Sequence, residues 1–464
     1  MIALLSFGCA SMAEFLFDAS EMPAEKAVGE AQAVVGRPRL RLPQRDQIEF
    51  RTASLNQLLP ADHPARVVWA AVEQLDLTPW LSEIKAVEGN VGRNTADPRL
   101  WVALWVYATM QAEGSAREIA RLCERDMAYQ WLCGGVTVNH HTLSDFRSQG
   151  GDKWDALLTQ LLAGLMAEGL VQLKRVAQDG MRVRASAGKA SFRRKATLER
   201  CHAEAKEQVE TLKRLADENP SELNRRQQAA RERAARERME RIEAALANCN
   251  QLQEQREQRA KVSCEPAKEA RASTTDPEAR NIKFPNGGYG PGYNAQFSTD
   301  TDSGLIVGVD VTNSGSDSEQ LAPMLDQVKE RCGKSPDEAL VDGGFATKEA
   351  ITDAEEKHAC TVYAPLKDVA KQVAAGTDPH AKKKGDSPAV AAWRERMGTA
   401  AAKIIYKLRP QTAEWVNALC RNRGLWQMPV RGQPKCRIVA LLYAITHNLI
   451  RAVNLRAQAA TMTN

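Results

Sequence analysis

Apolar residues recur at every third and fourth position between Asn56 and Phe146, which is the spacing of one face of an α-helix. The pattern is clear from Val67 to Leu75 and again from Leu100 to Tyr107, after Pro98. Proline is favoured in the first turn of a helix, so Pro98 marks the start of a new one. We expect an all-α unit of about five helices over this part of the chain.

Two short helices are predicted inside this unit, over 114–126 and 140–147, joined by a turn. Thr142 and Ser144 suit the start of the second helix, and His140 and His141 simply begin it. Two short helices joined by a turn suit a helix-turn-helix that binds DNA. A plain helical bundle fits the pattern equally well, and both interpretations stay open at this point.

Short β-rich runs, bounded by Gly, Asp or Pro, predict strands further along the chain. Helices are expected over 318–331 and 347–357. The resulting order is three strands, a helix, a strand, a helix, a strand and a final helix after 401. This order predicts an α/β architecture with a mixed five-stranded sheet, in which an antiparallel meander adjoins parallel crossovers. The expected strands are 173–179, 293–299, 304–311, 338–342 and 360–364.

The density of charged residues distinguishes one segment from the rest of the chain. Half of the twenty residues from Ser221 to Glu240 are charged, which predicts a solvated helical hairpin or coiled coil. This charged helical segment either binds protein or DNA, or it is a loop insertion without a binding role. The expected segments are a poorly ordered leader 1–36, a helical domain 37–155, the start of the α/β core 156–186, a charged helical insertion 187–280, the core continued 281–365, a flexible Lys-, Ala- and Gly-rich connection 366–400, and C-terminal helices of the core with a basic tail 401–464.

The 464 residues carry a net charge of +5, and none of the ten cysteines forms a Cys-x-x-Cys pair. The scattered cysteines argue against a disulfide framework and a Cys zinc site, and they indicate reduced thiols in the cytoplasm. The apolar N-terminus lacks a basic region before it, and the apolar run 438–450 is shorter than the roughly 20 residues that span a membrane. We therefore expect no membrane segment, and a buried amphipathic helix over 438–450.

Two acids end predicted strands in the same way, Asp179 in RVAQDGMRV and Asp342 in ALVDGGFAT. A carboxylate at a strand end, followed by a glycine that lets the backbone turn, is well placed to hold a cation. Each one alone is typical of an ordinary Asp-Gly turn. As a pair on one sheet they indicate a divalent-cation site.

A third acid stands alone in a basic segment. From Ala401 to Asn464 there are ten Lys and Arg residues but one acid, Glu414. Glu414 could pair with Arg409 or Arg421. Such a segment is typical of a phosphate-backbone binder, however, where a lone carboxylate opposes binding unless it ligates a metal. A helix starting near Glu414 would place Arg421 two turns away on the same face.

Several motifs in order resemble the DDE transposases of bacterial insertion sequences, in the kind that has a helical N-terminal domain before a ribonuclease-H-like core. The resemblance covers roughly 40–186 and 280–455. It implies that the helical domain 37–155 binds DNA and that 156–186, 281–365 and 401–464 form the catalytic core. It is carried by LNQLLPADHPARVV, GRNTADPRLWVALWVYA, GSAREIARLCERDMAYQWLCGG, HHTLSDFR, QDGMRVRASAGKASF, GPGYNAQ, VTNSGSDSEQLAPM, LVDGGFATKEAI and MPVRGQPKCRIVALLYAITHNLIRA. The family's third block runs Tyr, two residues, Arg, three residues, Glu, six residues, Lys. Here Tyr406, Arg409, Glu414 and Arg421 match it, with four residues between Arg409 and Glu414 and with Arg in the Lys position.

The resemblance implies that Asp179, Asp342 and Glu414 hold two Mg²⁺ ions, for which Mn²⁺ could substitute, and cut and join DNA at terminal inverted repeats. It also implies a homodimer or higher oligomer on double-stranded DNA, associated with the nucleoid in the cytoplasm. Tyr406 and Trp415 are candidate stacking groups, although a core position suits Trp415 better. The expected phosphate contacts are Arg182, Arg184, Arg409, Arg421, Arg431 and Lys435.

Other polar residues have weaker signals. Asn294 and Gln296 alternate on one strand face and could touch the site or the DNA. Asp310 and Asp317 are rival acids, and Asp317 is expected at a helix N-terminus. Two other functions remain open: a ribonuclease-H-like nuclease or resolvase without strand transfer, and an inactive repressor that binds the element.

Overall fold

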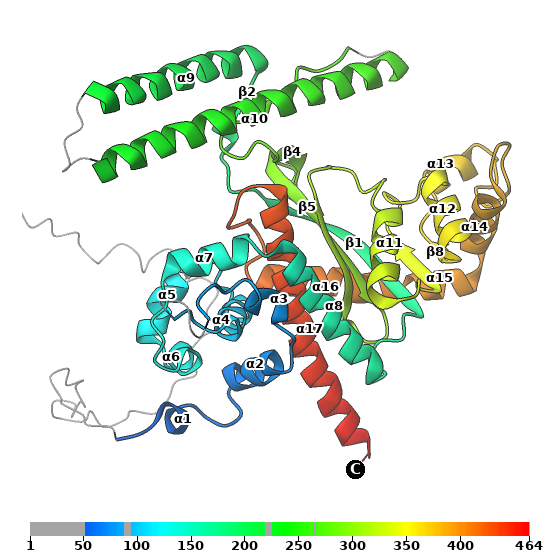
Figure 1. Ribbon diagram of the computed structural model, residues 1–464. Coiled ribbons are helices and arrows are strands. Elements are labelled where there is room, and N and C mark those ends of the chain that lie inside the picture. Colours follow the sequence, from blue (N-terminus) through cyan, green and yellow to red (C-terminus); the bar gives the residue numbers. More distant parts are fainter. Residues whose placement is uncertain (1–51, 88–93, 219–224, 264–265, 464) are drawn as a thin grey trace, which may run out of the picture. The chain divides into compact units, whose positions relative to one another are not determined.

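The computed structural model describes residues 52–87, 94–218, 225–263 and 266–463. The expected leader 1–36 lies outside these ranges. Residues from Ala53 onward form one compact unit, drawn in Figure 1.

The N-terminal part is helical, as predicted, but the residues described between Thr52 and Ser148 contain seven helices rather than about five. Its centre is α4, which starts at Pro98 behind the N-cap Asp97 and is buried along nearly its whole length. The capping carboxylate of Asp97 accepts from the Arg99 amide at 2.8 Å, and it satisfies one of the otherwise unpaired amides. The helices are α1 (Leu55–Leu58), α2 (Pro64–Glu73), α3 (Thr78–Leu81), α4 (Pro98–Met110), α5 (Ala116–Arg125), α6 (Met127–Cys133) and α7 (His140–Ser148), followed by α8 (Gly151–Ala167).

The expected turn between the two short helices contains a helix of its own. Asp126 ends α5 and caps α6, because its carboxylate accepts from the amides of Ala128 and Tyr129. Gly134, in the left-handed conformation, ends α6. Helices α5 and α7 still pack together. The cap of α7 is Asn139 and not Thr142 or Ser144, since the Asn139 side chain accepts from the His141 amide at 2.8 Å.

The second part is a six-stranded mixed sheet in the order β4-β5-β1-β7-β8, with β6 also paired to β5. β1 runs antiparallel to β5 and parallel to β7, and β8 runs parallel to β7. All five predicted strands are present, and β4 is an additional short strand beside β5. The bounds are β1 (Arg175–Arg184), β4 (Arg280–Lys283), β5 (Tyr289–Asp300), β6 (Ile306–Thr312), β7 (Glu338–Val341) and β8 (Thr361–Tyr363); β2 (Phe192–Arg193) and β3 (Ala272–Ser273) form a separate pair.

Helices cover both faces of this sheet. The α-carbon of Gly308 on β6 faces Met324 and Val328 of α11 (Leu321–Cys332). Asp179 points to the other face, where α16 (Trp415–Asn422) lies. Helices α12 (Lys348–His358) and α15 (Ala400–Tyr406) complete this part.

The last helix, α17 (Gln433–Thr463), joins the two parts, because it packs against α4, α8 and β6. Residues 438–450 lie within it and are largely buried, as predicted. By length and composition the stretch Gln433–Thr461 could cross a membrane, but 67% of its most apolar window is buried inside the protein. It is therefore a core helix of this fold.

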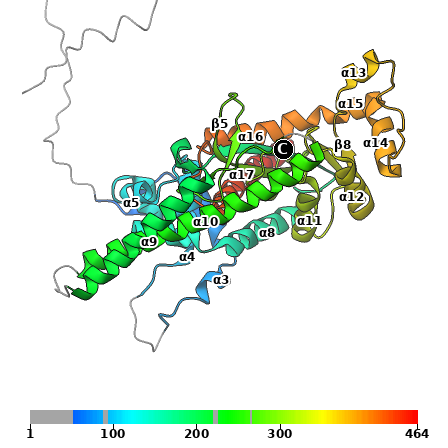
Figure 2. The ribbon, with the colours of Figure 1, turned by 90° about the horizontal axis from the view of Figure 1, so that it is seen from above.

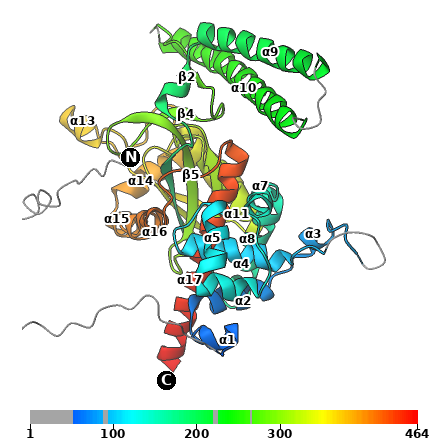
Figure 3. The same cartoon turned by 90° about the vertical axis from the view of Figure 1, so that its left-hand side faces the viewer.

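Two long helices follow β1. Helices α9 (Lys195–Glu218) and α10 (Arg225–Ser263) lie side by side (Figures 2 and 3). Leu198, Ala245 and Cys249 pack with the segment Ala270–Ala272 in a small apolar cluster separate from the main core.

The segment 366–400 differs from the flexible connection we expected. It contains α13 (Val369–Ala374) and α14 (Pro388–Gly398). Trp393 is buried and donates its indole N–H to the carbonyl of Ala364 at 3.1 Å. The buried residues of α14, Ala389, Val390, Trp393 and Met397, have helical spacing. The Lys- and Gly-rich run before them dominates the composition of the segment and hides this pattern.

Candidate active site

The sheet register brings Asp179 and Asp342 to the same level. β1 and β7 run parallel, and Gln178 lies opposite Val341. The next residue on each strand is one of the two aspartates. Asp342 is exposed just past the end of β7, whereas the Asp179 side chain is only 20% exposed. The two Asp-Gly sequences thus lie at neighbouring positions along one edge of the site.

Arg409 connects the first and third acids. Its guanidinium lies 3.0 Å from Asp179 Oδ1 and 3.4 Å from Glu414 Oε1. Arg409 itself is buried, while the Glu414 side chain is 61% exposed. Asn417, also buried, donates to the second oxygen of Asp179 at 2.9 Å. Asp179 and Glu414, 235 positions apart in the numbering, therefore share one cation.

A π-helical turn accounts for the extra residue between Arg409 and Glu414. Residues Pro410–Glu414 form this turn, which leads directly into α16. Pro410 has no amide hydrogen and its ring crowds the preceding turn, so a regular α-helix is disfavoured there. A π turn holds one more residue than an α turn. Arg409 and Glu414, five positions apart, consequently meet as residues four apart do in an α-helix.

Burial raises the pKa of Asp179 above its usual range. The Arg409 guanidinium opposes this shift, and the amide of Gly180 also lowers the pKa through a hydrogen bond at 3.0 Å. The carboxylates of Asp317 and Asp342 raise the pKa again through like-charge repulsion. Asp179 is thus a carboxylate whose charge is costly unless a cation lies beside it.

A second polar cluster lies next to these acids. Asp317 Oδ1 accepts from the side-chain amides of Asn294 at 2.6 Å and Gln296 at 2.7 Å. Gly180 makes room for it, because its α-carbon faces all three side chains. Our expectation for Asp317 was wrong: α11 begins only at Leu321, with Gln320 as its N-cap. The expectation that Asn294 and Gln296 share a face agrees with their common bond to Asp317.

Sequence reasoning missed one residue of the site, Asn417, and it considered Asp317 only as a rival acid at a helix N-terminus. Asn417 stands one helical turn after Glu414, and this spacing could have indicated it. Asp317 is brought in by a loop, for which no periodic signal exists. The other rival acid, Asp310, lies opposite Gln296 on β6, and its carboxylate is 3.4 Å from Arg437 on α17.

The remaining predicted residues lie at varied distances from the acids. The Tyr406 hydroxyl donates to the Val341 carbonyl at 3.3 Å, next to Asp342. Trp415 is 39% exposed and packs on His447 and Arg451, so it is not a fully buried core residue. The other predicted phosphate contacts do not touch the acids in the structure. Arg182 donates to the Gly315 carbonyl and Arg431 to the Ser186 carbonyl. Arg184 lies over the Phe284 ring and Arg421 over the Trp426 ring, while Lys435 is exposed.

The three acids fit a hard divalent cation by chemistry, because all their ligand atoms are carboxylate oxygens. Within the described ranges, no three His, Cys, Asp or Glu side chains converge closely enough to hold a metal ion. Instead, the guanidinium of Arg409 lies against Asp179 and Glu414. This contact shows that a positive charge fits between Asp179 and Glu414, the first and third acids.

Two family models match this chain. One, described as a transposase DDE domain, matches residues 263–449, and the other, described as a transposase domain (DUF772), matches residues 53–149. The first range contains Asp342 and Glu414, and the second contains the N-terminal helices α1–α7. No curated protein and no solved structure matches the chain. The helical N-terminal part, the mixed sheet with its acids and these two matches together show that the chain belongs to the DDE transposases of insertion sequences.

Proposed function

We propose that this transposase cuts and joins DNA at the terminal inverted repeats of its element, with Asp179, Asp342 and Glu414 as the catalytic acids. The observation that carries the proposal is the shared contact of Asp179 and Glu414 with one cation, beside Asp342. In such a reaction, water cleaves a phosphodiester to free a 3′ hydroxyl. That hydroxyl then attacks a phosphodiester of the target and displaces its 3′ oxygen.

DDE transposases typically use divalent metal ions. Here the carboxylates of Asp179, Asp342 and Glu414 would hold Mg²⁺, or Mn²⁺ in its place. When bound, these ions activate the attacking oxygen and stabilise the leaving one. Arg409 would have to release Asp179, and its guanidinium would then be free to contact a phosphate. Asn417 would keep Asp179 oriented through this exchange.

The rest of the assignment follows from position and charge. We infer a ribonuclease-H-like core, interrupted between β1 and β4 by the charged insertion 187–280. Arg182, Arg184, Arg421, Arg431 and Lys435 are proposed phosphate contacts, and the N-terminal helices are proposed to read the terminal repeats. Two ends must be joined in one event, so a dimer or larger assembly on DNA is expected.

The test is strand transfer of a labelled, pre-cut element end into plasmid DNA with Mg²⁺. The terminal sequence is taken from the DNA that flanks the gene. We expect Asp179→Asn, Asp342→Asn and Glu414→Gln each to abolish joining while binding of the end persists. Glu395→Gln is the matched control, because Glu395 is exposed on α14.

Each other outcome favours a different function. Cleavage without joining by the wild type indicates a nuclease or resolvase. Binding with neither reaction indicates a repressor. Joining that survives Glu414→Gln would remove Glu414 from the catalytic set.

A further inference from the structure

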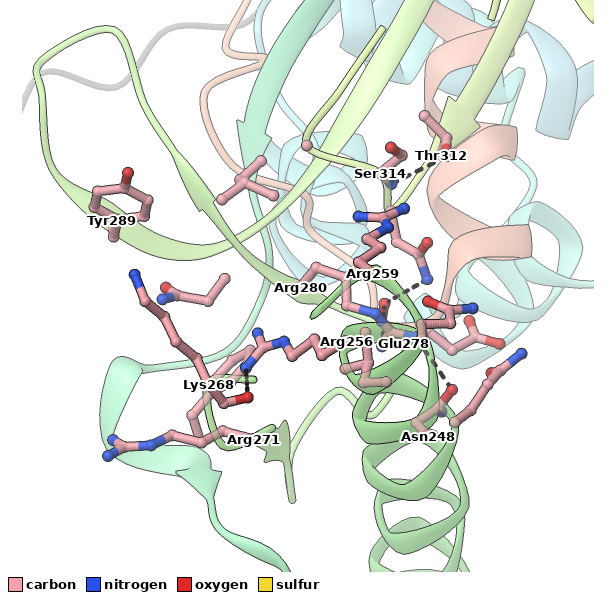
Figure 4. A pocket seen from close by; sticks show the side chains of 18 of the residues that line it. Asn248, Arg256, Arg259, Lys268, Arg271, Glu278, Arg280, Tyr289, Thr312 and Ser314 are labelled. Atoms are coloured by element: carbon pink, nitrogen blue, oxygen red, sulfur yellow. Dashed lines mark hydrogen bonds between the residues drawn. The ribbon is translucent and has the colours of Figure 1, made fainter. Parts of the chain in front are cut away.

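A groove of about 1440 Å³ lies between α10 and the hairpin formed by β4 and β5. Its walls are the last turns of α10 on one side and the strand Arg280–Ile282 with Tyr289 on the other. Figure 4 shows Arg256 and Arg259 leaving α10 toward the groove, with Tyr289 on the hairpin. The proposed catalytic acids are not among its lining residues, so this is a separate surface.

Positive charge predominates along the groove. Six cations line it, against the three acids Glu269, Glu278 and Glu319. Two of these acids are already engaged, because Glu269 pairs with Arg194 at 3.0 Å and Glu278 accepts from the Gln433 amide. The cations are Lys189, Arg256, Arg259, Lys268, Arg271 and Arg280.

These cations have no carboxylate partner within 4 Å among the residues that the structure describes. Arg256 and Arg280 bond only to neutral oxygens, such as the Glu269 carbonyl at 2.8 Å and the Asn248 side chain at 3.3 Å. Arg259, Lys268 and Arg271 are exposed and make no side-chain hydrogen bond in that part of the chain. Most other surface arginines of α9 and α10 that form ion pairs do so along their own helix, as Arg236 does with Glu232. The groove thus keeps several charges available for an anionic ligand.

One end of the groove leads toward the candidate active site. The loop residues Ser314, Gly315 and Gln320 line it, and the same loop carries Asp317. The Gly315 carbonyl accepts from Arg182, and the Gln320 carbonyl accepts from Gln178, one residue before Asp179. Gln178 and Asp179 point to opposite faces of β1, so these bonds place the loop beside the strand that carries Asp179 and not in line with its carboxylate.

The size and lining of the groove exclude a small-molecule site. Such sites occupy about 300–1,000 Å³ and are mostly apolar. This groove is larger, and its lining is mostly polar. Tyr289 is 55% exposed at its rim, where an aromatic ring can pack against sugars or bases. A long polyanion is the ligand that fits this combination.

We propose that this groove binds the sugar-phosphate backbone of duplex DNA next to the cleavage site, so that α10 and the β4–β5 hairpin clamp the substrate. The proposal deepens the proposed function and rests on it for the identity of the polyanion. It assigns a DNA-binding role to the charged arm, rather than contact with another protein.

The test uses full-length protein and a random-sequence 30-base-pair duplex, in EDTA, with salt varied. The variant Arg259→Gln/Lys268→Gln/Arg271→Gln removes three groove charges. The control Lys213→Gln/Arg231→Gln/Arg233→Gln removes three exposed charges from α9 and α10 outside the groove. Each lost phosphate contact lowers the slope of log affinity against log salt by about 0.9. We expect the groove variant to lose roughly 2–3 from the slope and to bind at least about tenfold more weakly at low salt, while the control changes little.

Hydrogen exchange provides the second measurement. Added duplex should slow exchange in residues 252–262 and 280–290 of the wild type, but not of the groove variant. Circular dichroism checks that both variants are folded. Equal slopes for the groove variant and the control, or unchanged exchange in the wild type, would overturn the proposal.

Failure of the proposed function is distinguishable, because binding in EDTA does not require catalysis. If the wild type does not carry out strand transfer, but the groove variant shows the smaller slope of log affinity against log salt, the groove binds DNA and the proposed catalytic function is wrong. If the groove variant binds and joins DNA as the wild type does, the proposed catalytic function is supported and the proposed DNA-binding groove is wrong.

Discussion

Gly180 shows how a single residue shapes the site. A Cβ atom at this position would lie less than 3.0 Å from Asp317, Gln296 and Asn294. Those three side chains are bonded to one another, and Asn294 and Gln296 are fully buried. They cannot move apart without breaking these bonds, so Gly180 is required for close packing rather than for backbone freedom.

We therefore expect Gly180→Ala to lower the free energy of unfolding by about 1–3 kcal/mol. Urea denaturation measures this change. Gly188→Ala is the control, because nothing lies within 4 Å of its added Cβ and its φ is −85°. A Gly180→Ala protein as stable as wild type would mean that the Asp317 cluster is loosely packed.

His447 makes stability depend on pH. It is buried on α17, and its Nε2 donates to the Gly304 carbonyl at 2.8 Å. Its Nδ1 is buried without a partner. Burial lowers the pKa of His447 to about 4 from 6.5. The folded protein therefore keeps this ring neutral at pH values where the unfolded chain protonates it.

Because the folded-state pKa is lowered, the stabilisation is present above pH 6.5 and is lost as pH falls toward 4. The loss amounts to about 3 kcal/mol over that window. His447→Gln keeps a donor for Gly304 but does not titrate. We expect the difference in unfolding free energy between wild type and His447→Gln to change between pH 6.5 and 5, where few carboxylates titrate. A constant difference would show that His447 is protonated in the folded state.

At the scale of elements, the π turn Pro410–Glu414 brings Arg409 and Glu414 into contact. Deleting Gln411, which is exposed, restores three residues between Arg409 and Glu414. The turn would then be one residue shorter, with Pro410 kept at its start, and it would still present both side chains on the same face. We expect this variant to retain strand transfer. Inserting one alanine after Gln411 should instead rotate Glu414 away and reduce joining about a hundredfold.

The same assay distinguishes the alternatives. Joining that is lost on deletion would mean that the site requires the π geometry itself. Joining that survives the insertion would mean that Glu414 is not a ligand.

The sequence predicts the strands well, because β-rich runs are bounded by Gly, Asp and Pro. Helix α6 is hidden in a segment too short to show a helical period. The π turn is also invisible, since it depends on how Pro410 is accommodated between two helices. The contact of Asp317 with Asn294 and Gln296 joins a loop to a strand, and only the folded chain brings them together. Asp342, by contrast, follows the end of β7, as the pattern predicts. The predicted strand end at Asp179 is wrong, because β1 continues to Arg184 and Asp179 lies in its middle.

For the whole molecule, the helical part and the sheet share one core. The main apolar cluster includes residues from Leu59 in the N-terminal part to Ala452 on α17. Thr446 on α17 reaches the carbonyl of Val106 on α4 at 3.5 Å. The described part of the helical segment 37–155 and the segment 156–186 are therefore continuous in packing. One family model matches 53–149 and the other 263–449, so neither covers 156–186. The cluster between α9, α10 and β3 lies apart from this core.

Unfolding should reflect this division. Leu104→Ala, at a fully buried position of α4, should cost about 2–5 kcal/mol. It should speed hydrogen exchange in α4 and β6 by the same factor, because one cooperative unit contains both. Leu198→Ala, in the separate cluster, should speed exchange only in α9 and α10. If Leu104→Ala left β6 unchanged, the two parts would unfold independently, and α17 would be a tether between domains rather than the centre of one core.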